Sequence, residues 1–185
     1  MLMTMTMPLT LSDVSAVIVT FNSAHIIARC LNALPDGVGV IVVDNASTDG
    51  TCQRVRSVRA DAVIVQNAVN EGYGRANNQG MAMVKTRYGL ILNPDALVDG
   101  DALGHLLAAG ARNPDAATIA PVLFSPESGL GRLRLMGPWE KDHRLADMEP
   151  DGDFCTWFLS AASSLFEMEA WRRIGGFDEK IFLHY

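Results

Sequence analysis

Five stretches of the chain are apolar enough to predict strands, and the first two show none of the alternation expected of a half-buried strand. They cover residues 14–20, 38–43, 62–66, 88–92 and 116–122. An unbroken apolar run of this length, bounded by residues such as Gly, Pro, Asn or Asp, predicts a strand that is buried on both faces. Strands of this kind belong to parallel sheets that are covered by helices.

The segments between these runs carry apolar residues at helical spacing, and most begin near a residue that can cap a helix. The expected stripes and caps are Ile27, Leu31 and Leu34 after Ser23; Cys52 and Val55 after Thr48 or Asp49; a helix from about 75 to 84; and Leu103, Leu106, Leu107 and Gly110 after Asp99. Strands alternating with helices through short connections predict a doubly wound α/β sheet with helices on both faces.

The pattern loosens after residue 122. Residues 124–153 are rich in Gly and Pro, which favours a long loop or a hairpin, while 154–166 is apolar enough for two strand segments and 169–174 for a short helix. We expect a disordered leader at 1–12 and one domain at 13–185, with a nucleotide-binding half at 13–122 and an incomplete acceptor-side half at 123–185. The apolar run at 181–185 has no closing element, which suggests a chain cut short.

Composition narrows the choice of partners. The 15 Lys and Arg residues against 21 Asp and Glu residues give a formal net charge of −6, which argues against nucleic acid. Cys30, Cys52 and Cys155 form no CxxC pair, so neither a zinc site nor a disulfide framework is expected. Without a signal peptide or a run that could span a bilayer, we expect a cytoplasmic protein. Peripheral contact with the inner face of the membrane and a homodimer stay open.

Polar side chains gather where the predicted strands end. Because ligands of open α/β sheets bind at the carboxyl ends of the strands, these residues are candidates for one crevice. The set is Thr20 and Asn22; Asp44, Asn45 and Ser47; and Asn93 and Asp95, with Gly72 and Arg75 on the loop between the last two groups. Such groups suit a nucleotide, because amides and carboxylates bind a base edge or a ribose and glycines let the backbone approach closely.

The phosphates of a nucleotide need a different explanation. The chain has no GxxxxGK[ST] motif, and Asn77 stands where the dinucleotide fingerprint that begins at Gly72 would need its third glycine. An acidic protein without a glycine cradle would hold a diphosphate through a divalent cation, with Asp95 as the ligand. Two simpler alternatives stay open: Asn93-Pro-Asp95 is only a turn, or Asp44 only caps its own loop.

Five motifs follow one another along the chain: Val17-Ile-Val-Thr-Phe-Asn22, Val42-Val-Asp-Asn-Ala-Ser-Thr-Asp-Gly50, Asn70-Glu-Gly-Tyr-Gly-Arg-Ala-Asn-Asn-Gln-Gly80, Leu92-Asn-Pro-Asp95 and Gly175-Gly-Phe-Asp-Glu179. In this order they resemble glycosyltransferase family 2, with the GT-A fold of nucleotide-diphospho-sugar transferases, and its rhamnosyltransferase-like branch in particular. Any one of these motifs is weak alone, and their shared order makes the resemblance specific.

The resemblance implies an inverting transfer of a sugar, rhamnose in this branch, from a thymidine or uridine diphosphate donor to a glycan or lipid-linked glycan. It also implies roles for individual residues. Asp44 matches the residue that binds the nucleobase, Thr20 and Asn22 lie along the nucleoside, and the segment from Gly72 to Asn77 closes over ribose and diphosphate. The residue matching Asp95 holds Mg²⁺ or Mn²⁺ against the phosphates.

One departure affects the expected activity. Members of this family continue past the residue matching Tyr185 into an acidic pair that includes the general base, so we expect this chain to bind donor but to transfer little sugar. A nucleotide-sugar-binding module without catalysis is therefore the main alternative. A sugar nucleotidyltransferase is a third, but it would need a glycine-rich, basic loop where this chain has Thr20-Phe-Asn-Ser23.

Overall fold

The structure, a computed structural model, describes residues 9–124, 131–134, 145–146, 152–153, 155–156 and 159–182. Its elements in chain order are a 3₁₀ turn at Leu11–Asp13, β1 (Val14–Thr20), α1 (Ile27–Ala33), β2 (Gly39–Asp44), α2 (Thr51–Val58), β3 (Val63–Gln66), α3 (Tyr73–Ala82), β4 (Tyr88–Leu92), α4 (Gly100–Arg112), β5 (Thr118–Ile119), β6 (Leu123–Phe124), β7 (Gly131–Arg134), β8 (Leu145–Ala146), β9 (Ser163–Glu167) and α5 (Met168–Ile174).

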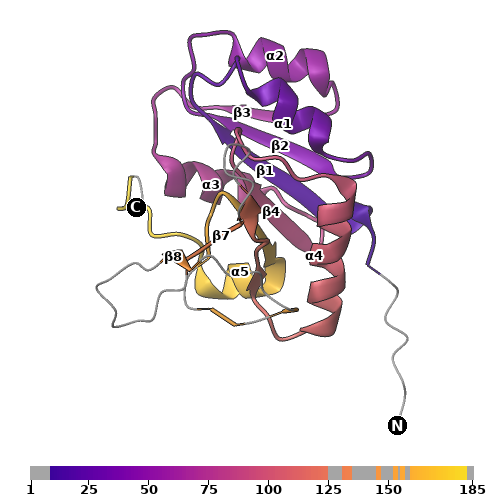
Figure 1. Cartoon of the computed structure of the whole chain (residues 1–185). Coiled ribbons are helices and arrows are strands. Elements are labelled where there is room, and N and C mark those ends of the chain that lie inside the picture. The colour runs from indigo at the N-terminus through magenta and orange to yellow at the C-terminus, as the bar shows by residue number, and fades with distance from the viewer. Residues whose placement is uncertain are drawn as a thin grey trace.

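The main sheet has the strand order β3-β2-β1-β4-β9-β5 (Figure 1). The first four of these strands are parallel, whereas β9 runs antiparallel to both β4 and β5. Every residue of β1 and of β4 is buried, as the unbroken apolar runs predict. The doubly wound, mostly parallel α/β sheet expected from the sequence is therefore confirmed.

Helices cover both faces of this sheet (Figure 1), and the sheet separates the hydrophobic core into two clusters. On one face, side chains of α1, α2 and α4 pack against alternate residues of β1, β2 and β4. On the other face, α3 and α5 pack against the residues in between. Among the described residues, no helix combines the length and the apolar character that crossing a membrane requires.

The helix α3 lies very close to the sheet at Gly80. A Cβ atom added there would lie 2.3 Å from Cγ1 of Val17 and 3.1 Å from Cγ2 of Val43, both on stiff β-branched side chains. Glycine at this position therefore allows the close packing that places the N-terminal end of α3 at the site described below.

We expect Gly80→Ala to lower the free energy of unfolding by about 1–3 kcal/mol, because the added methyl overpacks the core. Urea denaturation followed by circular dichroism measures this. Gly104→Ala is the matched control, since Gly104 lies inside α4 with nothing within 4 Å of the added Cβ. That change should raise stability by up to about 1 kcal/mol. Equal stability of Gly80→Ala and wild type would show that the packing is not tight.

The second half of the chain differs from the sequence-based expectation. The strand expected at 116–122 contributes only Thr118–Ile119 to the main sheet. It pairs with β9, which lies between β4 and β5 in the strand order. Within 154–166, the described residues form one strand segment, the start of β9, and residues 154, 157 and 158 lie outside the described part. Residues 124–153 were expected to form a long loop or a hairpin. Of the described pieces, β7, β8 and residue 124 of β6 belong to a small antiparallel sheet of order β6-β7-β8, whereas residues 152–153 belong to no strand.

Two of the three predicted helix caps are wrong in detail. The residue that caps α1 is Ile26, without a side-chain bond, while the hydroxyl of Ser23 donates to the Phe21 carbonyl. Gly50, in a left-handed conformation, caps α2. The polar side chains of these two loops mainly join the loops to each other. Asp49 accepts a hydrogen bond from the backbone N–H of Ala24 at 2.9 Å, and its other carboxylate oxygen accepts from the backbone N–H of Thr51, the first residue of α2, at 3.0 Å. Asp99 does cap α4, accepting a 2.9 Å hydrogen bond from the backbone N–H of Ala102.

Candidate functional site at the carboxyl edge of the sheet

Thr20 ends β1 and Asp44 ends β2, and the two residues are direct neighbours in the parallel pairing. Both side chains are buried, Asp44 being only 1% exposed. The Asp44 carboxylate accepts hydrogen bonds from the Thr20 hydroxyl at 2.9 Å, the Ser47 hydroxyl at 2.5 Å and the Ser47 backbone N–H at 3.0 Å. Three donors compensate the burial of this charge, so Asp44 fixes the turn that follows β2.

Within the chain, Asp44 therefore does cap its own loop. This does not exclude a nucleobase contact, because each carboxylate oxygen has two lone pairs and, among the described residues, Oδ2 accepts one backbone hydrogen bond, from Ser47. A base could reach only a narrow edge of so buried a group. The nucleobase role stays a prediction.

Asn22 and Ser47 join the loops that follow β1 and β2. The backbone N–H of Asn22 donates to the Ser47 hydroxyl at 2.8 Å, and the amide oxygen of Asn22 accepts from the backbone N–H of Thr48 at 2.9 Å. Asn22 has a φ of 50° and Ala46 a φ of 62°, both in the left-handed region that such tight turns require. The two loops thus form one cross-linked rim.

Asn45 connects this rim to the loop before α3. Its side chain is 2% exposed and donates to the carbonyl of Gly72 at 3.2 Å. Its amide oxygen accepts from the side chain of Asn67 at 2.9 Å and from the backbone N–H of Glu71 at 3.4 Å. Because the whole amide is used inside the protein, Asn45 positions the loop that contains Gly72.

Gly72 begins α3 with a φ of 84°, a conformation that other residues rarely adopt. A Cβ at this position would lie 2.6 Å from the carbonyl oxygen of Phe182. That same carbonyl accepts a 2.8 Å hydrogen bond from the backbone N–H of Tyr73. The first free N–H of α3 is therefore already paired with the segment that follows α5.

Arg75 and Asn77, which were predicted to contact the ligand, already have hydrogen-bonding or ionic partners within the chain. The Arg75 guanidinium pairs with Glu71 at 2.8 Å and with Glu179 at 3.1 Å, and these two carboxylates raise its pKa. A diphosphate would compete with both. Asn77 is fully buried, and its amide donates to the carbonyl of Tyr73 at 2.9 Å, while its Oδ1 has no partner among the described residues. Ligand contacts by either residue stay predictions.

Asn93 and Asp95 follow β4 on the other side of the Gly72 loop. Asn93 is held by its backbone N–H, which donates to the Ala162 carbonyl at 2.8 Å, and by its amide oxygen, 3.0 Å from the Tyr73 hydroxyl. Asp95 is exposed, and no hydrogen bond or ion pair within the described residues engages its carboxylate. Burial, with a further contribution from the charge of Asp95, raises the pKa of Cys30 and of Tyr73 to about 12.

The predicted site residues therefore lie along one continuous path. Asp44 is bonded to the rim, Asn45 joins the rim to Gly72, and Tyr73 joins Gly72 to Asn93 beside Asp95. The sequence analysis missed Tyr73, which makes one of these links, and Asn67, whose side chain donates to the amide oxygen of Asn45. Tyr73 could have been found from its place between Gly72 and Gly74, where a large side chain is flanked by residues that let it approach.

The carboxylates of this edge bear on the predicted divalent cation. No group of three or more His, Cys, Asp and Glu side chains in the described part of the chain could hold a metal ion. Among the described residues at this edge, Asp95 is the one candidate whose carboxylate has no partner, and it fits a hard cation of the Mg²⁺ type only if phosphate and water oxygens supply the other ligands. The donor set therefore suits a cation that arrives with a diphosphate.

The cysteines give a simple check of this environment. Burial, with a further contribution from Asp44, raises the pKa of the Cys52 thiol to about 11. The pKa of the buried Cys30 thiol is raised to about 12. Thiolate is the reactive form, so both should be nearly inert at pH 8, whereas Cys155 is exposed. We expect iodoacetamide to add one label to the native chain and three after unfolding, as read by intact mass. Rapid addition of two labels to the native chain would contradict the burial.

Comparison with known proteins gives this geometry a context. The sequence pattern of glycosyl transferase family 2 matches residues 15–167. The N-acetylglucosaminyl-diphospho-decaprenol L-rhamnosyltransferase of Mycobacterium tuberculosis is 27% identical over 177 residues, which cover 80% of this chain and 57% of that protein.

Two solved structures share the fold. The mannosyltransferase PcManGT from Pyrobaculum calidifontis, in complex with GDP-Man and Mn²⁺, is similar with a TM-score of 0.68 and 21% sequence identity. The aligned region covers 91% of this chain and 48% of the PcManGT chain. S. aureus TarS 1-349 in complex with UDP has a TM-score of 0.63 at 19% identity, with coverages of 91% and 51%. These likenesses confirm the GT-A fold, and the chain spans about half the length of the relatives it matches. The match of the family pattern over most of the sequence shows that the chain belongs to glycosyl transferase family 2.

Proposed function

We propose that this chain is the donor-binding part of an inverting, metal-dependent glycosyltransferase. The whole enzyme would transfer rhamnose from a thymidine or uridine diphosphate sugar to a glycan or a lipid-linked glycan, whereas this chain is expected to bind the donor and to transfer little sugar. Family membership and the activity for which the mycobacterial relative is named support the reaction and the sugar. The observation that supports the proposal is the state of Asp95. Its carboxylate is exposed and has no partner among the described residues, and Asp95 lies two residues after Asn93, whose amide oxygen lies 3.0 Å from the Tyr73 hydroxyl.

In this proposal the nucleoside lies along the rim formed by the loops after β1 and β2. The edge of Asp44 contacts the base, and Asn22 lies along the ribose side. The loop that contains Gly72 lies between this rim and Asn93, held to both by hydrogen bonds. A nucleoside placed there would carry its diphosphate towards Asp95.

Asp95 would hold Mg²⁺ or Mn²⁺ together with the donor phosphates. The bound cation would supply neutralising charge for the leaving diphosphate. The complex of PcManGT with GDP-Man and Mn²⁺ supports this choice of metal, as do the hard oxygen ligands on offer. Asn93 keeps β4 and the Gly72 loop together, so it holds the carboxylate of Asp95 next to the loop.

Inversion follows from a single displacement. The acceptor hydroxyl oxygen forms a bond to the anomeric carbon as the bond from that carbon to the diphosphate oxygen breaks, and the hydroxyl proton passes to a general base. None of the described residues is assigned as that base. The mycobacterial relative acts on a diphospho-decaprenol, by its name. A similar acceptor would bring this chain to the inner face of the membrane.

A panel of donors tests the proposal. Thermal unfolding is measured with Mn²⁺ and dTDP-rhamnose, UDP-GlcNAc or GDP-mannose. A ligand at a hundred times its Kd adds about 2.7 kcal/mol of stability, which is readily visible as a rise in Tm. We expect dTDP-rhamnose to give the largest rise. Stabilisation by GDP-mannose alone would contradict the donor assignment, and no stabilisation by any of the three would contradict the function.

A further inference from the structure

The segment after α5, residues 175–182, lies across the N-terminal half of α3. We call this segment the clasp. Its main attachment is the side chain of Asn78, whose amide makes two hydrogen bonds to the backbone of Phe177. Oδ1 accepts from the Phe177 N–H at 2.9 Å, and Nδ2 donates to the Phe177 carbonyl at 2.9 Å. One side chain thereby pairs with the clasp as a neighbouring strand would.

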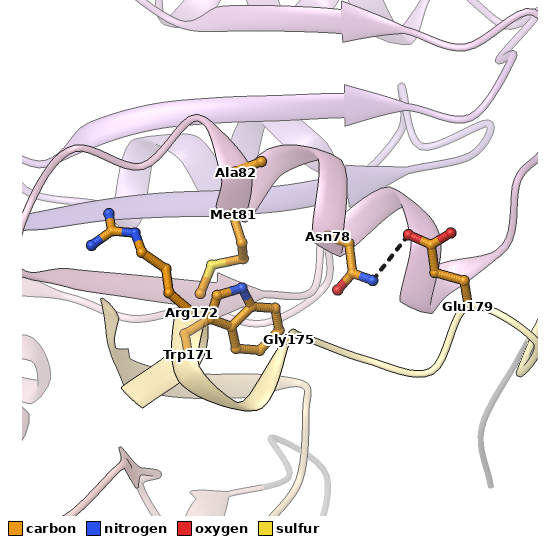
Figure 2. Close-up of a pocket in the computed structure, with 7 residues that line it drawn as sticks. All are labelled: Asn78, Met81, Ala82, Trp171, Arg172, Gly175 and Glu179. Carbon is orange, nitrogen blue, oxygen red and sulfur yellow. Dashed lines mark hydrogen bonds between the residues drawn. The ribbon is translucent and has the colours of Figure 1, made fainter. Parts of the chain in front are cut away.

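Further contacts fix the clasp on both sides of this pair. Nδ2 of Asn78 also lies 3.3 Å from the carboxylate of Glu179, as the dashed line in Figure 2 shows. Glu179 in turn pairs with Arg75 at 3.1 Å. The ring of Phe177 packs edge-on against Trp171, with ring centroids 5.1 Å apart.

The glycines of the clasp allow this close approach. Gly175 and Gly176 both have positive φ values, 86° and 84°. A Cβ at Gly176 would lie 2.6 Å from Oδ1 of Asn78, so any larger residue would displace the amide. Beneath the clasp, Figure 2 shows Asn78, Trp171 and Glu179 around a cavity of about 290 Å³ between α3 and α5.

The far end of the clasp reaches the candidate site. The carbonyl of Phe182 accepts the backbone N–H of Tyr73, and its atoms lie where a side chain on Gly72 would stand. Gly72 is bonded to Asn45, and Tyr73 lies against Asn93. The position of the Gly72 loop therefore depends on the position of the clasp.

We propose that Asn78 is a positioning residue, which holds the clasp and through it fixes the Gly72 loop for nucleoside diphosphate binding. The inference rests on the proposed function for its ligand, because it assumes that this loop contacts the donor. Among the described residues, the side chain of Asn78 makes its hydrogen bonds to the clasp, at Phe177 and Glu179. Its effect would pass through Phe177 and Phe182 to Tyr73, and through Glu179 to Arg75.

Asn78→Asp is the sharpest test, since it keeps the shape of the side chain and replaces only the donor group. The new carboxylate faces the Phe177 carbonyl and Glu179, while Arg75 and Arg172 are the cations nearby. We expect UDP and dTDP, each with Mn²⁺, to bind about tenfold more weakly at pH 7.5, the loss of roughly one or two hydrogen bonds. Hydrogen exchange of the Phe177 and Tyr73 amides should be faster without any nucleotide.

A pH series separates positioning from general damage. A protonated carboxyl regains an O–H donor, and the neighbouring carboxylate favours protonation, so the defect of Asn78→Asp relative to wild type should shrink as the pH falls from 7.5 to 5. Asn78→Leu cannot recover in this way and should keep its defect at every pH. Asn32→Asp, the same change at an exposed position of α1, is the matched control and should bind as wild type does.

The outcomes are distinct. If hydrogen exchange of the Phe177 and Tyr73 amides is unchanged in Asn78→Asp, the claim that Asn78 holds the clasp in place is wrong. Faster exchange with unchanged nucleotide affinity would overturn the positioning role and leave the proposed function intact. If wild type binds neither nucleotide, the proposed function fails and the positioning role fails with it, whatever the exchange shows.

Discussion

Asp44→Ala is expected to destabilise the chain by about 3 kcal/mol and to abolish nucleoside diphosphate binding. The change leaves the buried Thr20 hydroxyl and the donors of Ser47 without their acceptor, and each buried donor left unpaired costs about 1–3 kcal/mol. The rim that we propose to hold the nucleoside would lose its fixed shape. Urea denaturation and calorimetric titration of UDP and dTDP with Mn²⁺ measure the two effects.

Thr20→Ser is the control for this prediction, because it keeps the hydroxyl that donates to Asp44 and removes only a methyl group. It should cost about 1 kcal/mol of stability and leave binding within a few-fold of wild type. An Asp44→Ala chain that unfolds at the wild-type urea concentration would show that the carboxylate does not organise the rim. One that still binds nucleotide as tightly as wild type would refute the nucleobase role.

Asp95→Asn is expected to weaken nucleotide binding without lowering the stability of the chain. Stability should change by less than about 0.5 kcal/mol, since the side chain is exposed and unpaired among the described residues. Affinity for UDP and dTDP in Mn²⁺ should fall on the order of a hundredfold, because a neutral amide is a much poorer ligand for a hard cation than a carboxylate. Calorimetry at fixed Mn²⁺ measures the affinity.

Asp115→Asn serves as the matched control, because Asp115 is also an exposed carboxylate without an ion pair in the described part of the chain. It carries the same change of net charge and should leave nucleotide affinity unaltered. A similar loss of affinity in both variants would point to long-range electrostatics. No loss in Asp95→Asn would remove this residue from the donor site.

Much of the fold could be predicted because β1, β4 and nearly all of β2 are buried on both faces and so appear as unbroken apolar runs. The prediction of burial was wrong for β3, which lies at the edge of the sheet and is exposed at Val63. The place of β9 could not be predicted. It begins with Ser163 and Ser164, which interrupt the apolar run, and it pairs with β4 from far along the sequence. Local pattern carries no information about such a partner, so the insertion of a strand from the second half of the chain was not foreseen.

The candidate site was predictable in its location but not in its internal bonding. Thr20, Asp44 and Asp95 follow apolar runs, and parallel strands bring such positions to one edge. Spacing does not say which way a side chain points, so the engagement of Asn45 and Arg75 with other parts of the chain was not visible. The pairing of Asn78 with Phe177 joins residues 99 positions apart, which periodicity cannot detect.

The central claim is that this acidic chain binds its donor through a cation held on Asp95. The most direct test is calorimetric titration of UDP and dTDP into the wild-type chain, once with Mn²⁺ and once with EDTA. The account predicts that at least one of the two nucleotides binds on the order of a hundredfold more tightly with Mn²⁺. Equal affinity in EDTA, or no binding of either nucleotide in Mn²⁺, would contradict it.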